Sequence, residues 1–174
     1  MSRLSAEVSR LGVEVSRLGV EMSRLSGRMG NVEGSLYEQR YRDNVASRLG
    51  RRLRRVEIVS LGEVDALVQA LESGRVTERE WDDLASLDVL VRGRSGRGAD
   101  APEEYVAMEI SITIDPGDVR RARERASILV RASVPVQAYV AGRAITPEAE
   151  RLARELGVTV LLDRPADRQV GDLS

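Results

Sequence analysis

The sequence predicts an N-terminal parallel coiled coil followed by an α/β domain with a mixed sheet. A seven-residue repeat fills the first 36 residues. Short apolar runs and amphipathic stretches then alternate along the chain, which is the pattern of an α/β domain. The length of 174 residues suits one globular domain with an appendage. We expect a coiled-coil segment over 1–36, a domain over 37–163 and a flexible tail over 164–174.

The repeat places apolar residues at alternating steps of four and three, which is the heptad condition. The two apolar series are Leu4, Leu11, Leu18, Leu25 and Val32, and Val8, Val15, Met22, Met29 and Leu36. Valine at a with leucine at d favours two parallel strands. The pattern therefore predicts a homo-oligomer through residues 4–36, with a dimer favoured. Val13 and Val20 on the outer face leave a tetramer open, and a single helix folded onto its own domain is the other alternative.

Helical character continues from 36 to about 55, and capping residues mark the helices that follow. Thr77 begins a capping box, Asp115 precedes a proline at a helix start, and Thr146 opens a helix that Gly157 ends. Short alternating or β-branched runs predict the strands between them. The expected helices are 63–72, 78–86, 116–132 and 147–157, and the expected strands are 56–60, 88–92, 105–114, 136–140 and 158–162.

The missing residue types limit the chemistry. The chain has no histidine, no cysteine and no lysine, so all 27 basic residues are arginines. Without histidine there is no Ser-His-Asp triad, and without lysine there is no P-loop or Schiff-base chemistry. An enzyme of this composition would use acidic residues that hold a Mg²⁺-like ion. No apolar run reaches the roughly 20 residues of a membrane span, and no signal-peptide pattern opens the chain. We therefore expect a cytoplasmic protein with no membrane partner.

The most basic part of the chain lies between positions 36 and 56. Its arginines are Arg40, Arg42, Arg48, Arg51, Arg52, Arg54 and Arg55. Such a stretch is a candidate surface for contacts with nucleic-acid phosphates. The alternative is a solvated helix face whose arginines pair with neighbouring acids.

Two carboxylates are expected to face each other across a hairpin. Asp88 and Glu109 are symmetric about a turn whose midpoint falls between Gly98 and Ala99. Like charges directly opposite destabilise a sheet, and a divalent cation bridging them removes that cost. The alternative is an acid at a strand start beside a partly exposed glutamate that pairs with an arginine.

These residues resemble the PD-(D/E)XK nuclease superfamily, which has an α-β-β-β-α-β core. That superfamily places one acid at the start of a core strand and (D/E)-x-K on the next strand. Here Asp88 stands in LDVLVRG, and Glu109, Ile110 and Ser111 stand in YVAMEIS. The segments IDPGDVRRARERA, YVAGRAITPEAERLARELGV and TVLLD, with the heptads before them, are similar to a group of bacterial coiled-coil proteins placed in that superfamily. The resemblance covers residues 1 to about 163 and implies a restriction-endonuclease-like fold.

The resemblance implies a metal-dependent nuclease that hydrolyses phosphodiester bonds of DNA or another nucleic acid. Asp88 and Glu109, with the carbonyl of Ile110 and the extra acid Glu38, would hold Mg²⁺ or Mn²⁺. The bound ion would lower the pKa of a water molecule and stabilise charge on the phosphate. The nucleic-acid backbone would contact arginines of the basic stretch and of the helix after position 115, namely Arg42, Arg48, Arg51, Arg52, Arg55, Arg120 and Arg121.

One departure from the superfamily pattern bears on catalysis. Ser111 stands where the motif has lysine, and no lysine exists elsewhere in the chain. A serine can orient a water molecule, but it brings no positive charge. The catalytic set would be Asp88, Glu109 and Ser111. The alternative is a catalytically inactive nuclease-fold scaffold or nucleic-acid-binding module that its coiled coil assembles.

Overall fold

The computed structural model describes residues 2–96 and 100–163, with side chains described at Val8 and from Arg10 onward. The expected turn centre between Gly98 and Ala99, the tail over 164–174 and the side chain of Leu4 lie outside these residues. The chain divides into two compact units, Met1–Tyr37 and Glu38–Ser174.

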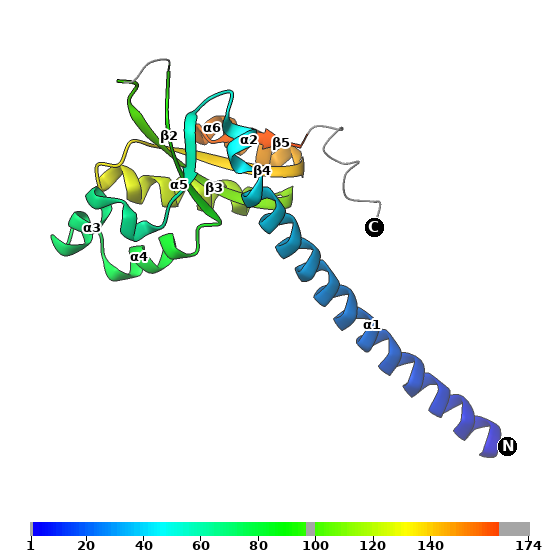
Figure 1. Ribbon diagram of the computed structural model, residues 1–174. Helices are drawn as coiled ribbons and strands as arrows, with labels where there is room; N and C mark the ends of the chain where they lie inside the picture. The colour runs from blue at the N-terminus through cyan, green and yellow to red at the C-terminus, as the bar shows by residue number, and fades with distance from the viewer. Residues whose placement is uncertain (1, 97–99, 164–174) are drawn as a thin grey trace. The chain divides into compact units, whose positions relative to one another are not determined.

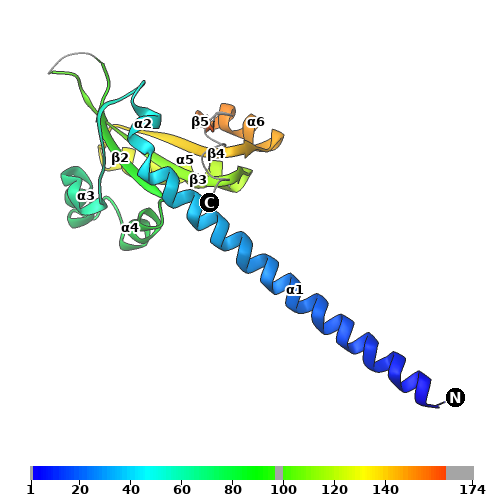
Figure 2. The ribbon, with the colours of Figure 1, turned by 45° about the vertical axis from the view of Figure 1, so that its right-hand side comes forward.

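The first unit is part of a single continuous helix, α1 (Ser2–Asp43), drawn in blue in Figures 1 and 2. From Val8 to Leu36 its apolar heptad side chains are all more than half exposed. The exposed stripe consists of Val8, Leu11, Val15, Leu18, Met22, Leu25, Met29, Val32 and Leu36. Among the described residues, no helix is long and apolar enough to cross a membrane.

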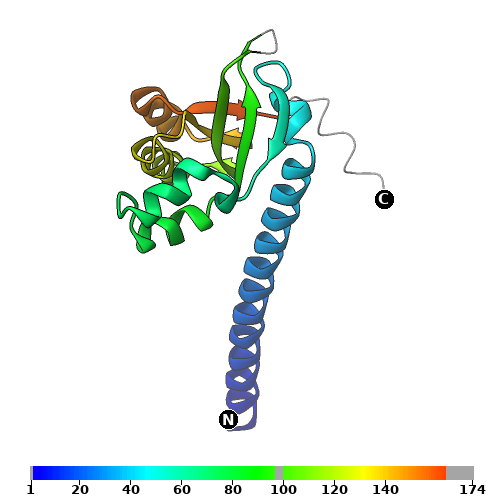
Figure 3. The ribbon, with the colours of Figure 1, turned by 60° about the vertical axis from the view of Figure 1, so that its left-hand side comes forward.

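The second unit is built on one mixed sheet with the strand order β1-β2-β3-β4-β5 (Figures 1 and 3). The strands are β1 (Arg54–Ile58), β2 (Val89–Arg94), β3 (Glu103–Ile114), β4 (Val136–Ile145) and β5 (Thr159–Leu162). β2 runs antiparallel to both of its neighbours, β1 and β3, and the last three strands are parallel. The α/β class and the mixed sheet are thus confirmed. The helices are α2 (Val45–Leu49), the 3-10 turn η1 (Leu61–Glu63), α3 (Asp65–Glu72), α4 (Glu78–Ala85), α5 (Pro116–Arg131) and α6 (Pro147–Leu156).

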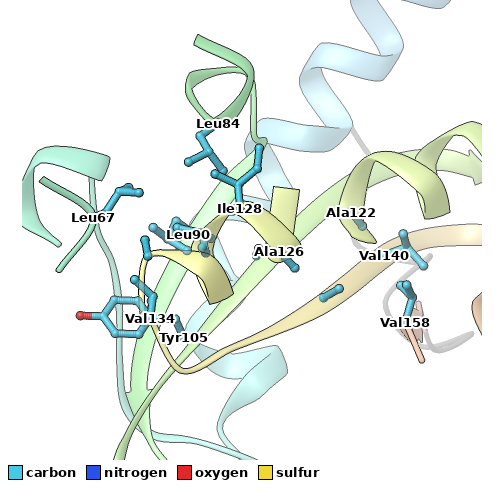
Figure 4. Close-up of a cluster of buried hydrophobic side chains, with 14 of the residues drawn as sticks. Leu67, Leu84, Leu90, Tyr105, Ala122, Ala126, Ile128, Val134, Val140 and Val158 are labelled. Carbon is cyan, nitrogen blue, oxygen red and sulfur yellow. The ribbon is translucent and has the colours of Figure 1, made fainter. Parts of the chain in front are cut away.

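Helices cover both faces of this sheet (Figure 3). On one face the main core joins α3, α4, α5 and α6 to the strands, and Figure 4 shows Leu84, Leu90 and Ile128 meeting in it. On the other face lies the segment around α2, where Leu53 packs against Gly93 of β2 and Arg52 reaches Tyr139 of β4. The sheet is therefore enclosed in its centre, which allows a charged side chain on it to be buried.

The capping residues act as the sequence predicts. The side chains of Thr77, Asp115 and Thr146 each accept a hydrogen bond from a backbone N–H of the first helical turn. Gly157 follows α6 in the left-handed conformation with φ 66°. Each of these contacts satisfies a backbone group that a helix end leaves without a partner, which explains why these boundaries could be located from the sequence.

The largest boundary differences from expectation are at the first helix and at β4. The helix expected to run to about 55 is broken: α1 ends at Asp43, α2 spans Val45–Leu49, and β1 begins at Arg54. β4 runs to Ile145 because its second half pairs with the second half of β3, which overrides the weak strand propensity of its Ala-Gly-Arg-Ala segment. The final strand, β5, is only partly buried because it lies at the edge of the sheet.

Replacing Ser133 by glycine is expected to raise the free energy of unfolding by about 0.5–1 kcal/mol. Ser133 follows α5 with φ 66°, a conformation that costs little only for glycine. Its N–H and that of Val134 donate to the carbonyls of Val130 and Leu129, so the turn itself is well formed. Urea unfolding measures the effect. As a control, Ser127→Gly inside α5 should lower stability, and an equal loss in both variants would contradict this account.

Candidate functional site

The two acids of the hairpin lie where the sequence predicts. β2 and β3 pair Val89 with Met108 and Leu90 with Ala107. One step further in the same register, Asp88 falls opposite Glu109. An Asp88 carboxylate oxygen accepts a hydrogen bond from the N–H of Ile110 at 2.6 Å. This bond fixes the Asp88 side chain beside the strand that carries Glu109.

Glu109 is buried and bound by two arginines of α5. Its side chain is 4% exposed. One carboxylate oxygen lies 2.6 Å from Nη1 of Arg125, and the other lies 3.4 Å from Nε of Arg121. The alternation along β3 places Glu109 on the face that α5 covers, so these contacts follow from the packing of the helix. The arginine pairing that the sequence left as an alternative is present at Glu109.

Arg125 ties three elements of the domain together. Besides Glu109, its guanidinium donates to Asp83 of α4 at 3.1 Å and to the carbonyl of Ser86 at 2.9 Å. The arginine side chain is 7% exposed. A buried guanidinium with this many partners is satisfied by them and holds Glu109 in one position.

Arg121 lies one helical turn earlier and is much more open to solvent. Its side chain is 49% exposed, and it forms ion pairs with Glu109 and with the buried Asp118. Asp118 also accepts a hydrogen bond from the N–H of Asp115 at 2.9 Å, as part of the cap of α5. The start of α5 therefore supplies a fixed anionic partner for Arg121.

Burial and mutual repulsion raise the pKa values of three acids in this region. Burial raises the pKa of Glu38, and the charge of Asp88 raises it further. Burial also raises the pKa of Asp88, against the opposing effect of its bond to Ile110. The pKa of Glu109 rises to about 7, first through burial and then through Asp88, although Arg125 and Arg121 act against this. The charge of Asp88 thus acts on both Glu38 and Glu109.

Protein stability should fall as pH rises through the range in which Glu109 ionises. Its pKa is about 7 in the folded chain and has an ordinary value of 4.5. The folded state therefore binds this proton more tightly. The resulting stabilisation is complete below pH 4.5 and is lost as pH rises to about 7, a change of about 3 kcal/mol. Urea unfolding of the wild type and of Glu109→Gln across this range measures it. Parallel pH dependences in the two proteins would contradict the assignment.

Two arginines predicted to bind nucleic acid are engaged within the domain. Arg48 forms an ion pair with Asp163, and its guanidinium lies 4.1 Å from the ring centre of Tyr41. Arg52 donates to the hydroxyl of Tyr139 at 3.2 Å. Both arginines therefore attach the α2 segment to the rest of the domain, and the ion pair of Arg48 agrees with the alternative that arginines of this stretch pair with acids.

The other predicted phosphate contacts are more accessible. Arg42 is exposed, and its nearest guanidinium nitrogen is 4.0 Å from the Glu38 carboxylate. Arg51, Arg55 and Arg120 also have exposed side chains, but the first two lie outside any helix. The structure does not bring these residues together with Glu109, whereas it places Arg121 directly beside it.

Ser111 follows Glu109 on the same face of β3 and is half-buried. Its backbone lies close to β4, because a Cβ atom at Gly142 would come within 2.4 Å of the Ser111 carbonyl oxygen. The positive charge near Glu109 comes from α5 and not from this strand.

Arg125 and Asp83 were not predicted from the sequence. The available signal was the position of Arg125 on the buried side of α5, three residues after Ala122 and four before Leu129.

The donor chemistry of the three acids fits a hard divalent cation. Carboxylate oxygens are the ligands that Mg²⁺ and Mn²⁺ prefer. Within residues 2–96 and 100–163, no group of three or more acidic side chains is already arranged as a metal site.

Comparisons with protein-family models, with curated proteins and with solved structures find no match to this chain. The protein is therefore described by its fold and its site alone. The second unit is an α/β domain whose mixed sheet carries two opposed acids at the start of β2, with a third acid nearby and two arginines from α5.

Proposed function

We propose that the second unit is a metal-dependent nuclease that hydrolyses phosphodiester bonds of DNA. The observation that carries this proposal is the opposition of Asp88 and Glu109 across β2 and β3, with Glu38 near enough for the charge of Asp88 to raise its pKa. Perturbed acids gathered at one place in a fold are typical of functional sites. The order of helices and strands is compatible with the fold that the resemblance to the PD-(D/E)XK superfamily implies, with α3 and α4 added between β1 and β2.

Each residue of the site has a role in this proposal. Asp88, Glu109 and Glu38, with the carbonyl of Ile110, would hold Mg²⁺ or Mn²⁺, which supplies Lewis-acid activation of water and phosphate. The N–H of Ile110 orients Asp88 through its 2.6 Å bond. Ser111 is placed to orient a water molecule. The exposed arginines Arg42, Arg51, Arg55 and Arg120 supply phosphate contacts that position the nucleic acid.

Cleavage of supercoiled plasmid with Mg²⁺ or Mn²⁺ tests the proposal. We expect the wild type to nick the plasmid, and Asp88→Asn or Glu109→Gln to reduce the rate by about 100-fold or more, as loss of an electrostatic group at a reacting centre does. Glu57→Gln is the matched control, because it removes an exposed carboxylate from β1 of the same sheet. It should cleave as the wild type does. Absent cleavage, or equal cleavage by all four proteins, would refute the catalytic proposal.

The pairing of Glu109 with two arginines favours a second candidate function. A nuclease fold in which arginines permanently neutralise the central acid would bind nucleic acid without cutting it. In that case the wild type should retain duplex DNA in a gel-shift assay and leave it intact. DNA binding that does not weaken as salt rises would rule out a contact dominated by phosphates.

We further propose that α1 joins copies of the chain through a parallel coiled coil over residues 4–36, with two copies favoured. The exposed apolar stripe from Val8 to Leu36 supports this, because solvent exposure of so many leucine, valine and methionine side chains is unfavourable. Gly12, Gly19 and Gly27 also weaken an isolated helix by about 1 kcal/mol each relative to alanine. A partner helix that covers the stripe compensates for that loss.

A further inference from the structure

The two arginines that bind Glu109 differ in how firmly they are held. Arg125 is 7% exposed, lies 2.6 Å from the carboxylate and has further partners on α4 and the segment after it. Arg121 is 49% exposed, and its contact with Glu109 is longer, at 3.4 Å. Arg125 is therefore a fixed part of the core, whereas the guanidinium of Arg121 can be reached from solvent.

We propose that Arg121 is the residue that binds the phosphate group undergoing reaction, and that it supplies the positive charge that Ser111 lacks. This inference rests on the proposed nuclease function. Of the two arginine contacts of Glu109, the one to Arg121 is the longer, so it is the contact that a cation at Glu109 would displace. Its N–H donors are then available to a phosphate beside the same carboxylate.

Contacts at the start of α5 would hold the Arg121 side chain near Glu109 after the Arg121–Glu109 contact is broken. Asp118 is buried, pairs with Arg121 one turn away on the same helix, and is itself fixed by the N–H of Asp115. Gly117 leaves room for the capping carboxylate of Asp115, since a Cβ atom at this position would lie 2.9 Å from Asp115 Oδ1. Asp118 thus holds Nη2 of the guanidinium, while Nε makes the longer contact with Glu109.

The chemistry of a guanidinium suits this role. Arginine stays protonated at all relevant pH values, so Arg121 donates hydrogen bonds and transfers no proton. Its planar group can donate two parallel hydrogen bonds to the non-bridging oxygens of a phosphate. Ser111 has no charge to offer, and Arg125 is enclosed by Glu109, Asp83 and the Ser86 carbonyl. Of the two arginines at Glu109, Arg121 is therefore the one placed to act on substrate.

Three variants of the full-length chain test the assignment: Arg121→Ala, Arg121→Lys and the control Arg123→Ala. Arg123 is exposed on the same helix and has no part in the site. The first measurement is the rate of plasmid cleavage with Mn²⁺. We expect Arg121→Ala to cleave about 100-fold more slowly. Arg121→Lys should lose less than Arg121→Ala, because it keeps the charge and loses only the paired donors. Arg123→Ala should match the wild type. Equal rates for wild type and Arg121→Ala, or equal losses in both Arg121 variants, would overturn the proposal.

The second measurement separates this inference from the nuclease proposal. It is the slope of log Kd against log salt concentration for a duplex oligonucleotide in the presence of Ca²⁺. Loss of one phosphate contact should reduce the slope by about 0.9 in Arg121→Ala and leave it unchanged in Arg123→Ala and Arg121→Lys. A wild type that does not cleave refutes the nuclease, while a changed slope would still support phosphate binding by Arg121. If the slope of Arg121→Ala equals that of the wild type, Arg121 does not bind phosphate, even if cleavage falls. If Arg121→Ala does not fold, the slope of Arg121→Lys decides, and a reduced slope in that variant overturns phosphate binding through the charge of Arg121.

Discussion

Arg125→Ala is expected to lower the free energy of unfolding by about 3–5 kcal/mol, because it leaves a buried carboxylate without its closest partner. Glu109 is 4% exposed and lies 2.6 Å from Arg125, so water cannot replace the lost guanidinium readily. The substitution also removes the bonds to Asp83 and to the Ser86 carbonyl, which join α4 to α5. A loss of this size is a large part of the stability of a typical domain.

Two comparisons show whether the loss arises from the ion pair. Arg123→Ala removes an exposed arginine from the same helix and should change stability by no more than about 0.5 kcal/mol. The effect of Arg125→Ala should be smaller at pH 5 than at pH 8, because burial raises the pKa of Glu109 to about 7 and a protonated Glu109 has no charge to neutralise. Urea unfolding at both pH values measures this. A loss that does not depend on pH would mean that packing, and not charge, explains it.

The triple variant Leu11→Ser, Leu18→Ser and Leu25→Ser is expected to abolish self-association of the chain. These leucines occupy one heptad series and are each more than half exposed on α1. Burial of a leucine side chain in an interface contributes about 1.5–3 kcal/mol, so three of them change the dissociation constant by about a thousandfold or more. Analytical ultracentrifugation measures the oligomeric state directly.

Val13 and Val20 provide the matched control for this experiment. They are as exposed on α1 as the three leucines, but they occupy the opposite side of the helix. Serine at both positions should leave a dimer intact. A monomeric wild type would contradict the coiled coil. So would a leucine variant that remains as fully oligomeric as the valine variant. Loss of a tetramer in the valine variant would instead support a higher-order bundle.

Much of the fold could be predicted because its signals are local. The capping side chains of Thr77, Asp115 and Thr146 are recognisable from a few neighbouring residues, and each contact is present. The extension of β4 to Ile145 depends on pairing with β3, more than 30 residues away, so its sequence alone reads as a loop. The break of the first helix at Asp43 likewise reflects how the segment that follows packs on the sheet.

In the candidate site, too, local spacing could be predicted from the sequence and long-range contacts could not. The opposition of Asp88 and Glu109 follows from the spacing of a symmetric hairpin, and the register of β2 and β3 agrees with it. The partners of Glu109 could not be predicted, because they depend on how α5 crosses the sheet. Arg125 finds Asp83 across a separation of 42 residues. Arginines that look alike in the sequence therefore divide into one that is buried and one that is half exposed.

Calorimetric titration with Mn²⁺ tests the central claim, that the acids at the start of β2 form a cation site. The proteins to compare are the wild type, the double variant Asp88→Asn/Glu109→Gln, and the control Glu57→Gln. We expect saturable binding in the wild type and in the control, and no binding in the double variant, because both of the opposed carboxylates are lost. Heat of binding that survives unchanged in the double variant, or a wild type that binds no Mn²⁺, would contradict the account.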